Sequence, residues 1–225
     1  ERGVDGLRIG TVSELLGEGV EPEVAARTRE AADALAAAGA SVEEVSVPAT
    51  VFGLSAYYLI APAEASSNLA RFDGVRFGLR DERATMPETY DATRTAGFGA
   101  EVKRRIMLGT YALSAGYYDA YYGQAQRVRT TIIRDFESAY ERFDALISPS
   151  SPCVAFRLGD KTADPMAMYR NDVCTVPSSL AGHPAMSVPF GTGADGLPVG
   201  IQVMAPALGE AMMFRVAAAI EGAAP

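Results

Sequence analysis

Cysteine and histidine are scarce in this 225-residue sequence, which contains only Cys153, Cys174 and His183. Two cysteines are too few for a disulfide framework, so a reduced, cytoplasmic environment is the simplest expectation. These three side chains cannot close a tetrahedral zinc site unless a carboxylate or a partner supplies a further ligand. Neither a disulfide-stabilised secreted domain nor a zinc module is therefore expected.

The sequence also lacks an excess of positive charge and long apolar runs. The sequence has 20 Lys and Arg residues against 28 Asp and Glu residues, which gives a net charge of −8. Nucleic-acid binding relies on clustered cations, so the chain is not expected to coat a nucleic acid unless a partner carries the positive charge. No apolar run reaches the roughly 18 residues of a membrane span, and no membrane partner is expected.

What remains is the composition of a globular protein, with 48% hydrophobic and 21% charged residues. Apolar residues in 7–12 and at positions 42, 45 and 47 predict two strands. Between them, an alanine-rich helix is predicted from Pro22 to about residue 38, with Gly39 as its C-terminal cap. A strand, a helix and a strand within about forty residues predict a parallel βαβ unit.

The rest of the sequence alternates between helical and strand-like segments. Apolar residues recur every three or four positions between 118 and 143, which predicts one long amphipathic helix. Further helices are predicted at about 51–72, 100–113 and 210–220, and strands at 145–147, 185–189 and 199–204. We find no linker or repeat, so the sequence predicts an α/β fold with a single α/β unit over residues 1–225.

Two familiar catalytic or cofactor motifs can be set aside. The glycines at 191, 193 and 196 match a dinucleotide-binding string, but a strand and not a helix is predicted to follow them, which favours a hairpin turn. No Gly-x-Ser-x-Gly nucleophile elbow occurs. His183, the only histidine, is better interpreted as a loop or core residue than as a catalytic base.

Two adjacent arginines, Arg104 and Arg105, stand near the start of the helix predicted at 100–113. Residues one position apart do not share a helix face, so one of the two must turn away from the other. An arginine that turns inward needs a carboxylate, which it can hold through two hydrogen bonds. Asp172, among apolar and small residues, is one candidate. From the pattern alone, Arg105 and Asp172 are as suited to pairing with each other as to holding a ligand.

Four blocks of the sequence, at 57–78, 97–111, 164–172 and 197–202, resemble the A subunits of the bacterial glutamyl-tRNA(Gln)/aspartyl-tRNA(Asn) amidotransferases, a branch of the amidase-signature family. The strings Arg-Phe-Asp-Gly and Glu-Val-Lys-Arg-Arg-Ile within these blocks carry the resemblance most specifically. It covers essentially the whole chain. The fold that it implies is part of the family's mixed-sheet α/β/α sandwich.

The resemblance also implies that this chain is the C-terminal half of such a subunit. The Ser–cis-Ser–Lys catalytic triad of the family lies in a Gly/Ser-rich segment that has no counterpart here, and Lys103 and Lys161 do not stand in the family's lysine context. The triad is therefore expected upstream. No catalytic residue is expected in this chain, which should be inactive by itself.

The family's glutamine-binding tyrosine, arginine and aspartate fall on Tyr57, Arg105 and Asp172. The resemblance implies a glutaminase subunit that passes ammonia to a B subunit, which uses ATP and Mg²⁺ to amidate misacylated tRNA, while a small C subunit joins A and B. No cofactor is expected in this chain itself. Two alternatives stay open, a different amidase-signature hydrolase of small amides and a non-catalytic binding or scaffold module. The Arg105 and Asp172 pair argues against the first, because a simple aryl or fatty amide carries neither charge.

Overall fold

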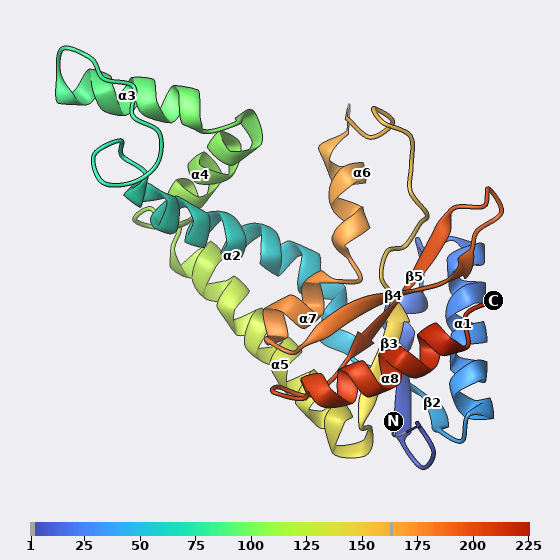
Figure 1. Ribbon diagram of the computed structural model, residues 1–225. Helices are drawn as coiled ribbons and strands as arrows, with labels where there is room; N and C mark the ends of the chain where they lie inside the picture. The colour runs from blue at the N-terminus through green and yellow to red at the C-terminus, as the bar shows by residue number, and fades with distance from the viewer. Residues whose placement is uncertain (1–2, 163) are drawn as a thin grey trace. The chain divides into compact units, whose positions relative to one another are not determined.

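A mixed five-stranded sheet organises the computed structural model, which describes residues 3–162 and 164–225 (Figure 1). The strand order is β2-β1-β3-β5-β4. β1 pairs in parallel with β2 and β3, whereas β5 runs antiparallel to both β3 and β4. The strands are β1 (Arg8–Val12), β2 (Ser41–Val45), β3 (Ala145–Pro149), β4 (Ala185–Thr192) and β5 (Pro198–Met204). The predicted α/β class is confirmed.

The described part of the chain contains eight α-helices. They are α1 (Pro22–Ala37), α2 (Gly53–Asn68), α3 (Met86–Gly97), α4 (Ala100–Ala112), α5 (Gln124–Arg142), α6 (Pro165–Tyr169), α7 (Val176–Ala181) and α8 (Glu210–Gly222). Within the described ranges, no helix is both long enough and apolar enough to cross a membrane.

The N-terminal β1–α1–β2 unit follows from local signals. Pro22 is the first residue of α1, where its missing N–H costs nothing. Gly39 follows the helix with a φ of +96°, a conformation that glycine adopts without a Cβ penalty. The chain then returns as β2, with Ile9 of β1 beside Val42. The predicted parallel βαβ unit is confirmed.

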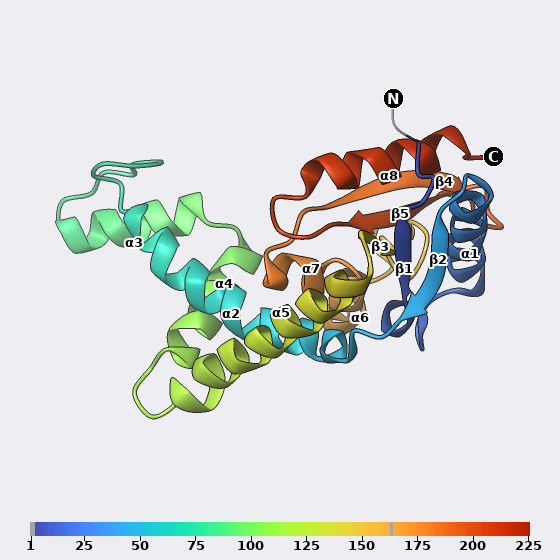
Figure 2. The same ribbon diagram turned by 90° about the horizontal axis from the view of Figure 1, so that it is seen from below.

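Alternation along the strands gives the sheet two apolar faces. On one face, Ile9, Ile147 and Val203 belong to a single buried core with α1 and α8. Both helices lie on that same face, and they contact each other (Figure 2). A fully buried side chain of this size stabilises the fold by roughly 1.5–3 kcal/mol, so this core holds α1 and α8 on the sheet.

The opposite face is covered by the C-terminal part of α5. A Cβ added at Gly10 would meet Leu146, Val45 and Phe143, so these side chains lie on the face opposite Ile9. Phe136 of α5 is completely buried. Helices on both faces of a mixed sheet make this an α/β/α arrangement.

Contacts within the chain group it into two compact units. Unit 1 comprises Glu1–Leu54 and Val128–Pro225 and contains the whole sheet, whereas unit 2 comprises Ser55–Arg127 and is helical. The single α/β unit over residues 1–225 stays a prediction.

The structure differs from the sequence-based expectation in several helices. Helix α3 was not predicted, although Thr85 and Glu88 form a capping box at its start and Pro87 lies in its first turn, where proline is tolerated. The long helix is preceded by a π-helical segment at Asp119–Gly123, so α5 itself begins at Gln124 and not near residue 118. The short helices α6 and α7 were also not predicted.

Candidate functional site

Close packing between α2 and α4 builds the part of the candidate site that lies in unit 2. Pro62 interrupts the hydrogen-bond ladder of α2, and Gly109 of α4 lies directly against its carbonyl group. A Cβ at position 109 would overlap that carbonyl and lie 2.8 Å from the Ala63 nitrogen. Tyr57 and Arg105 stand about one helical turn before this contact on their respective helices, so the packing brings them together.

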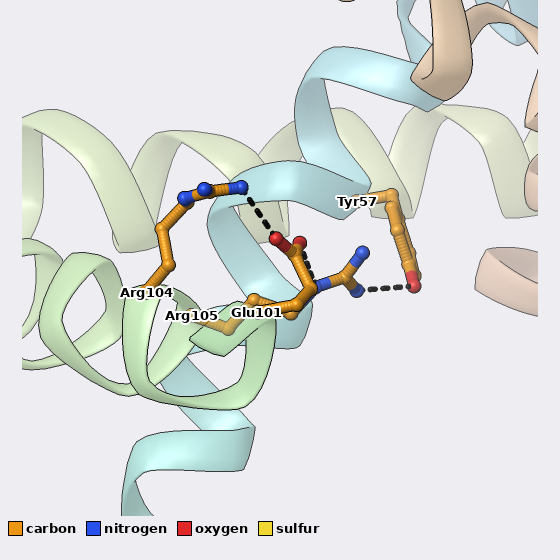
Figure 3. A network of polar contacts seen from close by, with 4 residues as sticks. All are labelled: Tyr57, Glu101, Arg104 and Arg105. Atoms are coloured by element: carbon orange, nitrogen blue, oxygen red, sulfur yellow. Dashed lines mark hydrogen bonds and ion pairs between the residues drawn. The ribbon is translucent and has the colours of Figure 1, made fainter. Parts of the chain in front are cut away.

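Arg105 contacts Tyr57 and Glu101 (Figure 3). Its Nη1 donates a hydrogen bond to the Tyr57 hydroxyl at 3.2 Å, and its Nε donates to Glu101 Oε1 at 2.9 Å. The guanidinium also lies 5.5 Å from the ring centroid of Tyr58, which packs edge-to-face on Tyr57. The arginine head group is thus fixed by a carboxylate and a phenol.

Of the two adjacent arginines, Arg105 is the more buried. Its side chain is 28% exposed and that of Arg104 is 54% exposed. Arg104 donates to the other oxygen of Glu101 at 2.6 Å from the solvent side. Both arginines therefore bind Glu101, and the one that also reaches Tyr57 is Arg105.

The surroundings of Arg105 stabilise its charged form. Burial opposes the charged form, but hydrogen bonds and Coulombic attraction from Glu101 and Tyr57 outweigh it and raise the pKa of Arg105. Arg105 therefore stays protonated and offers a fixed cationic donor to an anionic group.

Asp172 belongs to unit 1, at the end of the short 3₁₀ turn Arg170–Asp172 that follows α6. Its backbone carbonyl accepts from the Thr175 hydroxyl at 3.3 Å, and its side chain is half-buried. Of the three predicted site residues, the structure brings Tyr57 and Arg105 into contact within unit 2 and places Asp172 in the other unit.

Glu101 is a site residue that sequence reasoning missed. The inward arginine was expected to need a carboxylate, and only Asp172 was considered for it. The signal was present, since Glu101 precedes Arg105 by four residues and this order of Glu before a cation favours pairing on one helix face.

Nothing in the described residues points to a metal centre, because they contain no group of three or more His, Cys, Asp or Glu side chains suited to holding an ion. The His183 ring packs against Phe136 and Tyr140 at centroid distances of 5.6 and 5.1 Å. Burial lowers its pKa, with a smaller opposing effect from Glu137. This environment suits the interpretation of His183 as a core residue.

Comparison with known proteins identifies the family. A family model described as Amidase matches residues 2–214. The chain belongs to the amidase family. The α/β/α arrangement with its mixed sheet is therefore part of an amidase-signature sandwich, as predicted.

Two curated relatives are highly similar in sequence to this amidase-family chain. It is 61% identical over 221 residues to the glutamyl-tRNA(Gln) amidotransferase A subunit of Salinispora arenicola, covering 97% of this chain and 45% of that protein. The protein of the same name from Rubrobacter xylanophilus is 60% identical over 224 residues, covering 99% of this chain and 46% of that protein. The resemblance predicted from the sequence blocks is confirmed. The chain spans less than half the length of these relatives.

Solved structures agree with this assignment. The crystal structure of the glutamyl-tRNA(Gln) amidotransferase A subunit from Thermotoga maritima matches with a TM-score of 0.76 and 39% identity, covering 100% of this amidase-family chain and 44% of that one. A structure described as an amidase is only 22% identical, yet it has a TM-score of 0.75 and so shares the fold.

Proposed function

We propose that this chain is the glutamine-binding portion of the glutaminase subunit of a tRNA-dependent amidotransferase. Such a subunit releases ammonia from glutamine for the amidation of Glu-tRNA(Gln) or Asp-tRNA(Asn). The identity of about 60% to proteins named as that subunit supports the proposal. The observation that carries the site is the contact between Arg105 and Tyr57.

In the proposed site, each charged end of glutamine meets an opposite charge. The α-carboxylate binds the guanidinium of Arg105, and the α-ammonium binds the carboxylate of Asp172. Tyr57 closes the pocket with its ring and its hydroxyl. Fixing both ends places the side-chain amide where a nucleophile can attack it. Glu101 acts as a positioning residue, since it fixes the Nε side of the Arg105 guanidinium.

The remaining parts of the reaction are proposed to lie outside this chain. The nucleophile is the Ser–cis-Ser–Lys triad of the same subunit, so this chain alone should not hydrolyse glutamine. A B subunit uses ATP and Mg²⁺ and holds the misacylated tRNA, and a C subunit joins A and B in a cytoplasmic heterotrimeric ligase. The net charge of −8 suits a protein that leaves the tRNA to its partner.

The test compares two nitrogen donors in the assembled enzyme. Arg105→Ala and Asp172→Ala, made separately, should abolish most glutamine-dependent amidation, because each removes one partner of a charged contact with the ligand. Such truncations cost about 2–5 kcal/mol, which corresponds to roughly 30-fold to several-thousand-fold weaker binding. Amidation driven by an ammonium salt should be almost intact, because ammonia bypasses the glutamine site.

Arg104→Ala is the matched control. It removes a neighbouring guanidinium that also pairs with Glu101, but its side chain is more exposed and does not reach Tyr57. This variant should keep both activities. Equal losses with glutamine and ammonium in the Arg105 or Asp172 variants, together with a lowered Tm, would show that these residues hold the fold and do not bind glutamine.

A further inference from the structure

A cysteine and a lysine lie side by side in unit 1, in a segment to which the proposed function gives no role. Lys161 Nζ donates a hydrogen bond to Cys153 Sγ at 3.5 Å and another to Asn171 Oδ1 at 2.7 Å. Cys153 Sγ in turn donates to Asn171 Oδ1 at 3.2 Å. The ring of Phe156 lies 4.2 Å from Nζ, so the amine is held beside the sulfur by an amide and an aromatic face.

This Cys153–Lys161 pair can be reached by small solutes. Both side chains are half-buried, and both line a cavity of about 770 Å³. Cys153 also borders a second cavity of about 280 Å³ together with Asn171. The other cysteine differs, since Cys174 is fully buried and burial raises the pKa of its thiol to about 12, with a smaller contribution from Cys153.

We infer that Cys153 and Lys161 form an oxidisable pair, which hydrogen peroxide converts into a covalent S–N crosslink between the two side chains. A thiolate is the form of cysteine that attacks peroxide. The proton-donating amine 3.5 Å from the sulfur is placed both to assist that attack and to trap its product.

The chemistry proceeds in two balanced steps. First, the Cys153 thiolate attacks one peroxide oxygen, so that an S–O bond forms and the O–O bond breaks. The departing hydroxide takes a proton from the Lys161 ammonium, which yields water, a sulfenic acid and a neutral amine; the sulfur loses two electrons to the peroxide. Second, the neutral amine attacks the sulfenyl sulfur, forming the S–N bond. Hydroxide leaves the sulfur with a proton from the amine as a second water.

The crosslink has a local consequence. It removes the ammonium group that donates to Asn171, the residue directly before Asp172. The flexible four-carbon stem of lysine allows Nζ to approach the sulfur without movement of the backbone. The crosslink itself does not depend on the proposed function, and it can be detected without any activity assay.

The test uses the full-length protein in its native assembly, treated with hydrogen peroxide, alkylated under denaturing conditions and digested with trypsin. Trypsin does not cleave after a modified lysine, so the crosslinked product is residues 143–157 joined to residues 158–170. Its mass should be lower than the sum of the two peptides by two hydrogens, or about 2 Da. Dithiothreitol should restore the free thiol and the free lysine.

Lys161→Arg is the matched variant, because it keeps the positive charge and removes the amine that forms the S–N bond. It should lose the joined peptides completely and accumulate a Cys153 sulfenic acid that dimedone traps. The inference is overturned if the variant gives the same product as the wild type. It is also overturned if residues 143–157 are found joined to 171–215 as a Cys153–Cys174 disulfide, or if Cys153 stays unmodified while exposed methionines are oxidised.

Discussion

The backbone contact between α2 and α4 predicts that Gly109→Ala will separate Arg105 from Tyr57. The new Cβ would overlap the Pro62 carbonyl and lie 2.8 Å from the Ala63 nitrogen. Both neighbours are backbone atoms, and alanine has no rotamer that could avoid them. The two helices must therefore move apart, and the 3.2 Å hydrogen bond from Arg105 to the Tyr57 hydroxyl is lost with them.

Two opposing effects set the magnitude. Overpacking of a tightly packed contact costs about 1–3 kcal/mol, and a clash with backbone belongs at the upper end of that range. Alanine in place of glycine inside a helix returns about 1 kcal/mol. The net loss is about 2 kcal/mol, so the variant should melt at a lower Tm than the wild type.

The assay is a melting curve together with the glutamine KM of the assembled enzyme. Gly222→Ala is the control, because Gly222 ends α8 and has no atom within 4 Å of an added Cβ. The control should keep or slightly raise Tm and leave KM unchanged, while Gly109→Ala should lower Tm and raise KM. A Gly109→Ala protein with wild-type Tm and wild-type KM would refute the reasoning.

Two further variants test polar side chains of unit 1. Burial opposes ionisation of Glu14, but hydrogen bonds to its carboxylate from Ser46, from the Val47 N–H and from Ser13 outweigh it and lower its pKa. Because the pKa of Glu14 is lower in the folded state, its ionised form stabilises the fold above the ordinary glutamate pKa of 4.5, and this stabilisation is lost as pH falls. Glu14→Gln should therefore flatten the acid side of a Tm–pH curve. An unchanged acid slope would contradict this. The Tyr140 hydroxyl is buried without a hydrogen-bond partner among the described residues. Tyr140→Phe should therefore leave the free energy of unfolding unchanged or raise it by up to about 1 kcal/mol. A clear decrease in that free energy, measured by urea unfolding, would contradict this.

Local signals explain which parts of the fold could be predicted from the sequence. Pro22, Gly39 and the apolar residues on either side of the helix act over short distances along the chain, and they define β1–α1–β2 without knowledge of the rest. Helix α3 was not predicted, although the capping box at Thr85 and Glu88 and the proline in its first turn are local signals of a helix start. The order β2-β1-β3-β5-β4 depends on contacts between distant segments, which no local pattern encodes.

The candidate site also has one part that the sequence could predict and one part that it could not. That one of two adjacent arginines must turn inward follows from helix geometry, and Arg105 does so. Its contact with Tyr57 joins residues 48 positions apart, and it depends on the packing of Gly109 against Pro62. Spacing in the sequence could not predict that contact, so the choice of Tyr57 rested on the family resemblance alone.

Glu101 bears on the rival interpretation, in which Arg105 and Asp172 pair with each other. That interpretation arose because an inward arginine needs a carboxylate, and Glu101 meets this need within α4 itself. Since the Glu101 side chain is 44% exposed, the pair contributes little stability, at most about 1 kcal/mol, but it does hold the guanidinium in place. Within unit 2, Glu101 and Tyr57 use two of the five N–H donors of Arg105, which leaves donors for a substrate carboxylate. The Arg105 guanidinium is therefore already held in place within unit 2, and the role of Asp172 has to be decided by the comparison of glutamine with ammonium as nitrogen donor.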